Sequence, residues 1–138
     1  MASVPNLRGP REKMLGWVHL PRFVDKVRLI SAGKLPPDYQ ENFCKGFDGH
    51  WLEASGANKD AFLEAVRRAK NDAEVAQWVR ENVKKSPQEI EAFNTRVLTR
   101  GKNDETSERL AQRKKEVGVD RPEVQTFVDL IDADEGRL

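Results

Sequence analysis

Three motifs of the kind that begin α-helices divide the second half of the chain, at 71–74, 86–89 and 120–123. In each, a side chain that can accept a hydrogen bond (Asn71, Ser86 or Asp120) stands three residues before a glutamate. Such a pair satisfies backbone amides that the first helical turn leaves free. This spacing predicts a series of short helices in this half of the chain.

Apolar residues recur at helical spacing beside these motifs, which predicts four helices that each bury one face. The stripes are Phe62, Val66 and Ala69; Val75, Trp78, Val79 and Val83; Ile90, Phe93, Val97 and Leu98; and Val124, Phe127, Val128 and Ile131. The stretch from Asp104 to Val117 has few large apolar residues, so we expect a solvated helix or a spacer there.

A first helix is predicted from Pro21 to Gly33, with Phe23, Val27 and Ile30 on one face. Proline in the first turn and glycine after the last are typical helix ends. Residues 1–15 contain prolines and basic residues without a sustained period, so they predict a flexible arm over the surface. We therefore expect the folded domain to span 16–138.

Between Gly33 and Asn58 the helical period disappears, which predicts a long irregular loop. An Asp-Gly pair between apolar residues in 47–51 favours a minimal β-hairpin there. The loop also carries aromatic residues, which either line a ligand pocket over the first helix or cap a small core. They are Tyr39, Phe43, Phe47 and Trp51.

Together these patterns predict a single all-α domain of five to six helices, with a long aromatic loop and at most one minimal hairpin. A length of 138 residues fits one domain. The single cysteine, Cys44, cannot form an internal disulfide, which favours a reducing compartment. No apolar run approaches the roughly 20 residues of a membrane span, and Met1–Pro10 lacks a signal-peptide stretch, so we expect a cytoplasmic protein.

The charge is balanced in total but uneven along the chain. A net charge of +1 argues against nucleic acid or an anionic membrane surface as partners. Residues 1–35 hold seven basic and two acidic side chains, whereas 120–138 hold two basic and six acidic ones. Either these are solvated faces, or the acidic last helix packs near the basic first helix, within one chain or across a dimer. Docking of this kind should weaken in molar salt.

The first helix is the richest candidate site, because it combines arginines with an acid at helical spacing. Asp25 lies three residues from both Arg22 and Arg28, so its carboxylate can accept a hydrogen bond from each guanidinium group. The remaining N–H donors of the two arginines would then suit a carboxylate or phosphate. The alternative is an ion-pair cluster that joins this helix to the acidic tail. The candidate ligand-binding residues are Arg22, Asp25, Lys26, Arg28, His19, Asp48 and Trp51.

Other chemistries find little support. A zinc site would need His19, His50, Cys44 and an acid such as Asp48 to converge, and their spacing matches no metal motif, so we expect no metal. Cys44 is expected to be a small packing residue. A calcium loop from Asp132 fails at its fifth and sixth positions, and no phosphate or dinucleotide loop is present, so we expect no cofactor.

Three functions remain open. The leading hypothesis is a non-enzymatic module that binds a small anion or a protein partner through the first helix, with the aromatic loop as a lid. An alternative is an enzyme in which His19 or Asp48 acts as a general base beside the arginines. A third is a structural homodimer held by the apolar stripe of the last helix.

Several strings resemble a bacterial family catalogued as a domain of unknown function, number five thousand and sixty-nine. They are Leu20–Arg28, Ala32–Pro36, Phe47–Gly49, Asp72–Val75 with Trp78–Val79, and Asp134–Arg137. The resemblance covers about Gly16 to Arg137, and its most specific element is Arg22-x-x-Asp25-Lys26-x-Arg28. It implies a small, mostly helical, cytosolic bacterial protein and assigns no catalytic residue.

Overall fold

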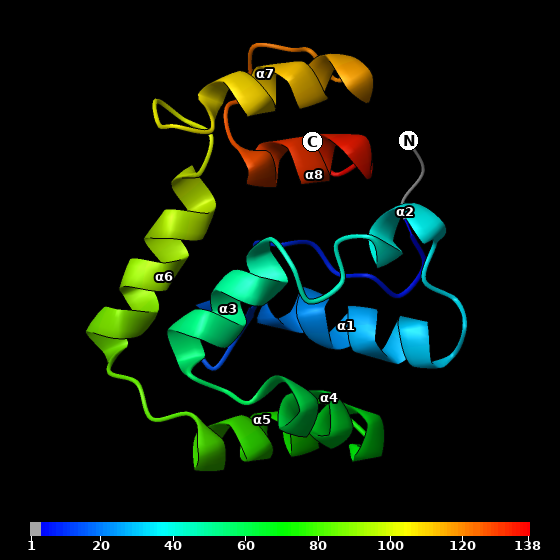
Figure 1. Ribbon diagram of the computed structural model, residues 1–138, viewed down its shortest axis with the longest axis vertical. Helices are drawn as coiled ribbons and strands as arrows, with labels where there is room; N and C mark the ends of the chain where they lie inside the picture. Colours follow the sequence, from blue (N-terminus) through cyan, green and yellow to red (C-terminus); the bar gives the residue numbers. More distant parts are fainter. Residues whose placement is uncertain (1–3) are drawn as a thin grey trace.

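The computed structural model describes residues 4–138, which form eight helices and one two-stranded antiparallel sheet (Figure 1). The elements are β1 (Lys13–Met14), β2 (Trp17–Val18), α1 (Leu20–Ser31), α2 (Pro37–Gln40), α3 (Phe47–Ser55), α4 (Lys59–Arg68), α5 (Asp72–Asn82), α6 (Pro87–Thr99), α7 (Ser107–Glu116) and α8 (Phe127–Asp134). The helical class is confirmed, but the expected count of five to six helices is wrong, because α2 and α3 lie in the region predicted as a loop.

The expected hairpin at 47–51 is wrong, because these residues form the first turns of α3. Gly46, at φ +54°, leads into the helix, and its carbonyl accepts a hydrogen bond from the backbone amide of His50. Asp48 in the first turn suits the positive end of the helix dipole. Trp51 is completely buried, so the helix places it in the core, where two short strand arms could not.

The hairpin lies instead at residues 13–18, where Lys13 pairs with Val18 and Met14 with Trp17. Its turn residues, Leu15 and Gly16, both have positive φ, at 52° and 85°. This backbone twist matches that of the flanking strands in two-residue turns. The turn therefore needs glycine at one position and strains a leucine at the other.

Much of the predicted arm is packed against the domain. Its first three residues lie outside the described residues. Leu7 and Met14 are buried at 6% and 9% exposure, and Arg8 reaches the acids of α1 and α5. The ordered domain thus includes residues well before the expected boundary at residue 16.

The main core surrounds a group of aromatic side chains from β2, α1, α3, α4 and α6 with aliphatic ones. Trp17 meets Trp51 edge-on at 6.0 Å between ring centroids, and Phe23 and Phe62 lie 4.9 Å apart. Such aromatic pairs add roughly 0.5–1.5 kcal/mol each beyond the burial of their area. This core holds α1 and α3 rigidly against each other, and these two helices carry the candidate site.

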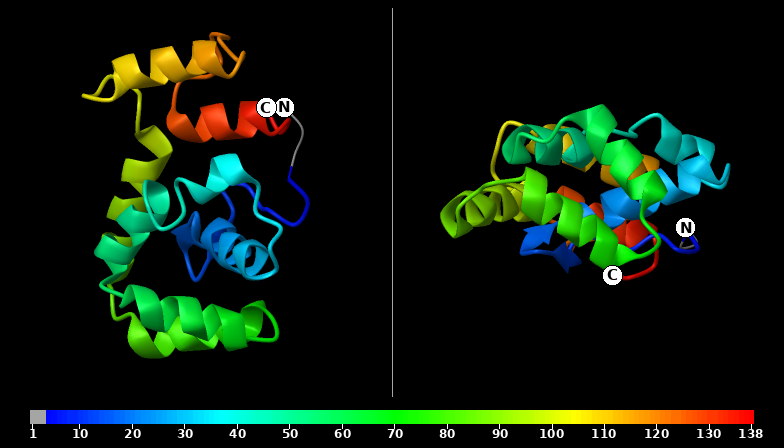
Figure 2. Two further views of the ribbon diagram at one scale, coloured as in Figure 1. Left: turned by 45° about the vertical axis from the view of Figure 1, so that its right-hand side comes forward. Right: turned by 90° about the horizontal axis from the view of Figure 1, so that it is seen from below.

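Helices α7 and α8 are stacked at one end of the molecule, with α4 and α5 at the other and α6 along one side (Figures 1 and 2). A second, smaller core lies between α7 and α8 and contains Leu110, Val119, Val124, Leu130 and Ala133. The predicted helix start at Asp120 is wrong: α8 begins after Thr126, whose hydroxyl accepts from the amide of Asp129 while the Asp129 carboxylate accepts from the amide of Thr126.

The acidic last helix packs against the basic start of the chain, as one of the two charge hypotheses predicted, and it does so within one chain. Arg22 pairs with Glu135 at 2.7 Å, and Arg11 pairs with Asp129 and Asp132. No helix among residues 4–138 is long and apolar enough to cross a membrane.

Candidate functional site

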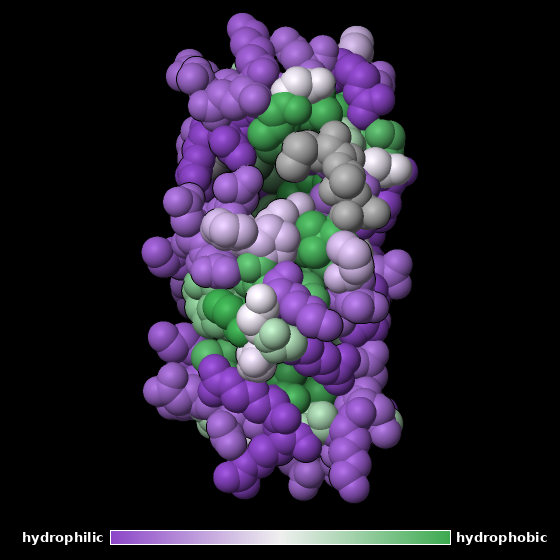
Figure 3. Space-filling model, turned by 90° about the vertical axis from the view of Figure 1, so that its right-hand side faces the viewer, coloured by the Kyte–Doolittle hydropathy of each residue, from purple (hydrophilic) through white to green (hydrophobic). Residues whose placement is uncertain are grey.

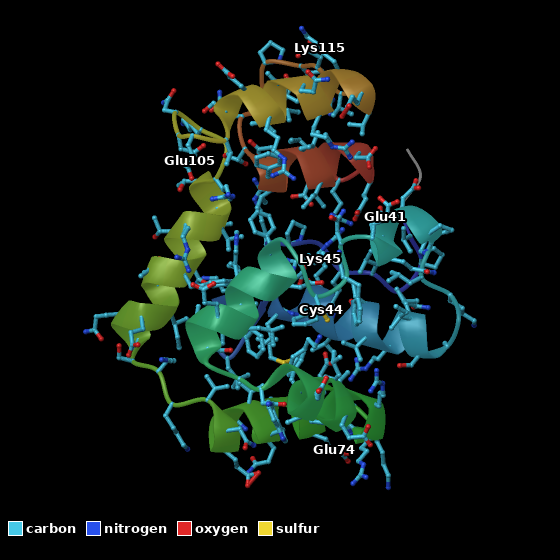
Figure 4. All side chains as sticks on the ribbon, viewed as in Figure 1. Glu41, Cys44, Lys45, Glu74, Glu105 and Lys115 are labelled. Atoms are coloured by element: carbon cyan, nitrogen blue, oxygen red, sulfur yellow. The ribbon has the colours of Figure 1, made fainter. Side chains whose placement is uncertain are left out.

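A cleft of about 1060 Å³ lies between the α7–α8 pair and the segment that runs from α1 through α2 to α3. Its size is at the upper end of the roughly 300–1,000 Å³ of small-molecule sites. Glu41 and Lys45, in the connection between α2 and α3, lie on the side of that connection that faces α8 (Figure 4). Seen from the side in Figure 3, hydrophobic residues are visible among hydrophilic ones below the upper end of the molecule.

The floor of the cleft is one face of α1 together with the residue before it. His19, Arg22 and Lys26 all line the cleft, and their spacing of three and four residues puts them on one side of the helix. They are 1%, 3% and 7% exposed, respectively. Three of the seven predicted site residues are thus brought together at the floor.

Behind the floor, Asp48 of α3 joins two of these residues through its carboxylate and is itself completely buried. His19 Nε2 donates to Oδ1 at 2.6 Å, Lys26 Nζ lies 3.3 Å from Oδ2, and the amide of Cys44 donates to Oδ2 at 3.0 Å. Burial opposes the charged form of Asp48. The hydrogen bond from His19 and the nearby cations nevertheless hold the pKa of Asp48 below its usual value.

His19 is held in an unusual state. Its φ of +70° lies in the left-handed region, which non-glycine residues rarely adopt. Its backbone amide donates to the carbonyl of Pro10 at 2.9 Å, which fixes the residue between the hairpin and α1. Burial lowers the pKa of His19, so the ring is neutral at neutral pH. Its Nδ1 atom has no hydrogen-bond partner among residues 4–138.

Arg22 uses most of its donors within the protein. Its two terminal nitrogens donate to the carboxylate of Glu135 at 2.9 and 2.7 Å, and its guanidinium lies 5.8 Å from the centre of the Tyr39 ring. The Tyr39 hydroxyl donates to the same carboxylate at 2.8 Å. Despite the cost of burial, the hydrogen bond from Arg22 keeps the pKa of Glu135 low. Only Nε of Arg22 has no partner within residues 4–138.

The expectation that Asp25 bridges Arg22 and Arg28 is wrong. Asp25 accepts from the Nε and backbone amide of Arg8 at 2.9 and 2.8 Å, and Arg28 donates to Asp72 of α5 at 2.8 Å. Arg8 also donates to Asp72 at 2.7 Å. Asp25 and Arg28 therefore belong to an ion-pair network outside the cleft lining. Arg8 was missed because it lies in the segment expected to be a loose arm.

The aromatic residues of the predicted lid are divided between two roles. Tyr39 and Phe47 line the cleft, whereas Trp51 does not and lies in the main core. Phe43 and Cys44 are partly buried against that core, and Cys44 fits the packing role expected for it. Burial raises the pKa of the Cys44 thiol, which disfavours the reactive thiolate.

The outer parts of the cleft combine free cations with an apolar wall. Lys45 and Arg109 line it and form no ion pair with any residue from 4 to 138. Phe127, Leu130 and Ile131 of α8 provide apolar surface across the cleft from Lys45, on the same side as Arg109 of α7. Sequence reasoning missed the two cations, because nothing local distinguishes them from solvated lysines and arginines.

Within residues 4–138, no group of three or more His, Cys, Asp or Glu side chains is placed to hold a metal ion.

The chain was compared with known proteins and with models of protein families. A search of curated proteins found no match. A family model described as "Domain of unknown function (DUF5069)" matches residues 4–137, as the resemblance noted from the sequence implied. Because this match spans nearly the whole chain, the protein belongs to the DUF5069 family.

Proposed function

We propose that the protein binds a small organic anion in the cleft between α8 and α1. The observation that carries this proposal is the pair of buried cations on the cleft floor, Arg22 and Lys26, which keep incompletely bonded donors. Nε of Arg22 has no partner among the described residues, and the hydrogen bonds of Lys26 go only to Asp48.

The incomplete hydrogen bonding of Lys26 supports an anion site more strongly than that of Arg22. Its Nζ has three donors, yet both of its contacts, at 3.3 and 3.4 Å, are long and go to a carboxylate that His19 already occupies. Burial lowers the pKa of Lys26 because the charged ammonium is poorly solvated there. An anion in the cleft would stabilise that ammonium, and the buried charge would add to the affinity.

The apolar wall supports an organic ligand over a bare inorganic ion. Phe127, Leu130 and Ile131 would contact a hydrocarbon or ring, while Lys45 and Arg109 would attract the negative charge. Such a combination of cations and apolar side chains fits a molecule with one anionic group on an apolar body.

The other two functions are less well supported. As a general base, Asp48 is enclosed and its oxygens are already hydrogen-bonded, so only His19 would serve. A homodimer through the last helix would need an exposed stripe, but Val124 and Val128 are buried within the chain. A bacterial, cytoplasmic setting is part of the proposal, supported by the lone cysteine and by the resemblance drawn from the sequence.

Thermal unfolding and calorimetry with a panel of carboxylates and phosphate monoesters of increasing apolar size would test the proposal. A ligand at 100 times its dissociation constant adds about 2.7 kcal/mol to the unfolding free energy. Lys45→Gln and Arg109→Gln should each weaken binding roughly fivefold, since each removes one exposed charge worth about 1 kcal/mol.

Lys59→Gln and Arg80→Gln are matched controls, because both residues are exposed and neither lines the cleft. They should leave affinity unchanged. A panel in which no anion raises the unfolding temperature, or in which the control variants weaken binding as much as the cleft variants, would contradict the proposal.

A further inference from the structure

His19 lines the cleft, and its contact with Asp48 determines which of its two ring nitrogens is left as a hydrogen-bond acceptor. The carboxylate of Asp48 can only accept, so the 2.6 Å contact requires that Nε2 of His19 carry the proton. Burial disfavours a second proton on the ring, so the other nitrogen, Nδ1, holds a lone pair and cannot donate. The buried aspartate thus selects one tautomer and one ring orientation.

This acceptor is unsatisfied. Nδ1 has no donor among residues 4–138, although His19 is 1% exposed. A buried acceptor without a donor costs free energy, and so does the left-handed backbone at this residue. The fold keeps both the unpaired acceptor and the left-handed backbone at a residue that lines the cleft. Unfavourable features of this kind are typical of positions that contact a ligand.

We propose that the bound anion carries its own hydroxyl group, and that this O–H donates a hydrogen bond to Nδ1 of His19. This inference rests on the anion site proposed above. The ligand class is therefore a protonated phosphate, or a carboxylate with a neighbouring hydroxyl. Arg22 and Lys26, three and seven residues after His19 on the same helix face, would bind the charged oxygens.

Access to Nδ1 needs a side-chain movement, because the atom is shielded from water in this state. Phe47 packs edge-on against the His19 ring at 5.6 Å and is only partly buried, as is His50 beyond it at 6.0 Å. Phe47 itself lines the cleft, so its rotation would uncover the part of the His19 ring that it contacts. The ligand would then occupy the space that the Phe47 ring vacates.

Inorganic phosphate and sulfate are suitable probes, because both are tetrahedral oxyanions but only phosphate keeps an O–H at neutral pH. Calorimetry should show that the full-length protein binds phosphate about 10-fold or more tightly than sulfate, since sulfate would leave Nδ1 facing another acceptor. Glycolate and acetate provide the same comparison for carboxylates. Similar affinities within each pair would overturn this inference and leave the anion site standing. Absence of binding by all four would overturn both proposals.

His19→Gln tests the acceptor directly. Glutamine can still donate to Asp48 from the position of Nε2, but it has no nitrogen or oxygen where histidine has Nδ1. The variant should lose the preference for phosphate and keep its sulfate affinity, and a preference that persists would refute the role of His19. If the variant does not fold, ¹⁵N spectra of the unaltered protein decide: the Nδ1 resonance of His19, assigned with His50→Gln, should move with phosphate and not with sulfate. A resonance that responds equally to both would overturn the inference.

Discussion

Replacing Glu135 by glutamine should destabilise the protein far more than a typical surface substitution. Glu135 and Arg22 form a bidentate pair whose side chains are only 2% and 4% exposed. The variant keeps the volume but removes the negative charge, so the guanidinium of Arg22 stays buried without a counter-charge. Breaking one partner of a buried pair costs roughly 3–5 kcal/mol.

We expect the lower end of this range, about 3 kcal/mol, because the glutamine oxygen can still accept one of the existing hydrogen bonds. The lost contact with Arg137, which is 33% exposed, adds at most about 1 kcal/mol. With a urea dependence of about 2 kcal/mol per molar, the unfolding midpoint should fall by about 1.5 M.

Equilibrium urea unfolding followed by circular dichroism measures this change. Glu105→Gln is the matched control: its pair with Arg100 is 3.6 Å long and Glu105 is 77% exposed, so the loss should stay below about 1 kcal/mol. Adding Arg22→Met to Glu135→Gln should recover much of the stability, because no buried charge then remains. A loss below about 1 kcal/mol for Glu135→Gln, or no recovery in the double variant, would refute the reasoning.

Three further predictions concern pH, backbone and helix ends. The unfolding free energy should fall as the pH drops from 7.5 to 5.5, by up to about 1.4 kcal/mol per pH unit. Burial keeps the pKa of His19 in the folded protein below its usual 6.5, so only the unfolded chain takes up a proton at this residue. His19→Gln should flatten this slope in urea titrations, leaving the part due to His50, whose pKa burial also lowers. Gly101→Ala should lower the unfolding free energy by about 3 kcal/mol in thermal unfolding, since the added Cβ would lie 2.9 Å from a methyl carbon of Leu110. Gly33→Ala is its control: φ is also positive there but no atom lies within 4 Å of the added Cβ, so the loss should be only about 1 kcal/mol. Ser86→Ala removes a complete capping box and should cost about 1 kcal/mol in the same assay, and an unchanged midpoint would contradict the capping role.

Sequence patterns predicted the features that depend on near neighbours in the chain. The caps at Asn71 and Ser86 are present as expected, because each needs only a hydrogen bond to an amide three residues away. The first helix also follows its apolar stripe and its proline and glycine ends. The Asp-Gly signal at 48–49 misled, since the burial of Trp51 outweighed the turn preference of two residues.

The site could be predicted only in part, for a different physical reason. Composition identified the cationic residues of α1, but their partners lie up to 113 residues away, and no local pattern specifies such pairings. The complementary charges of the chain ends left open whether these ends meet, and they did not specify that Glu135 would pair with Arg22. The pairing of His19 with Asp48 depends on where α3 lies over α1, which only tertiary packing decides.

The buried link between Arg22 and Glu135 also bears on how the protein is made. A ribosome releases the chain from its first residue at about 5–20 residues per second, so the helices of the main core emerge before α8 does. The apolar wall of the cleft, at residues 127–131, and the counter-charge of Arg22, at residue 135, leave the exit tunnel only after that core has emerged. The anion site that we propose is therefore incomplete in the nascent chain, and a ligand of that site would stabilise only the state in which α8 has docked.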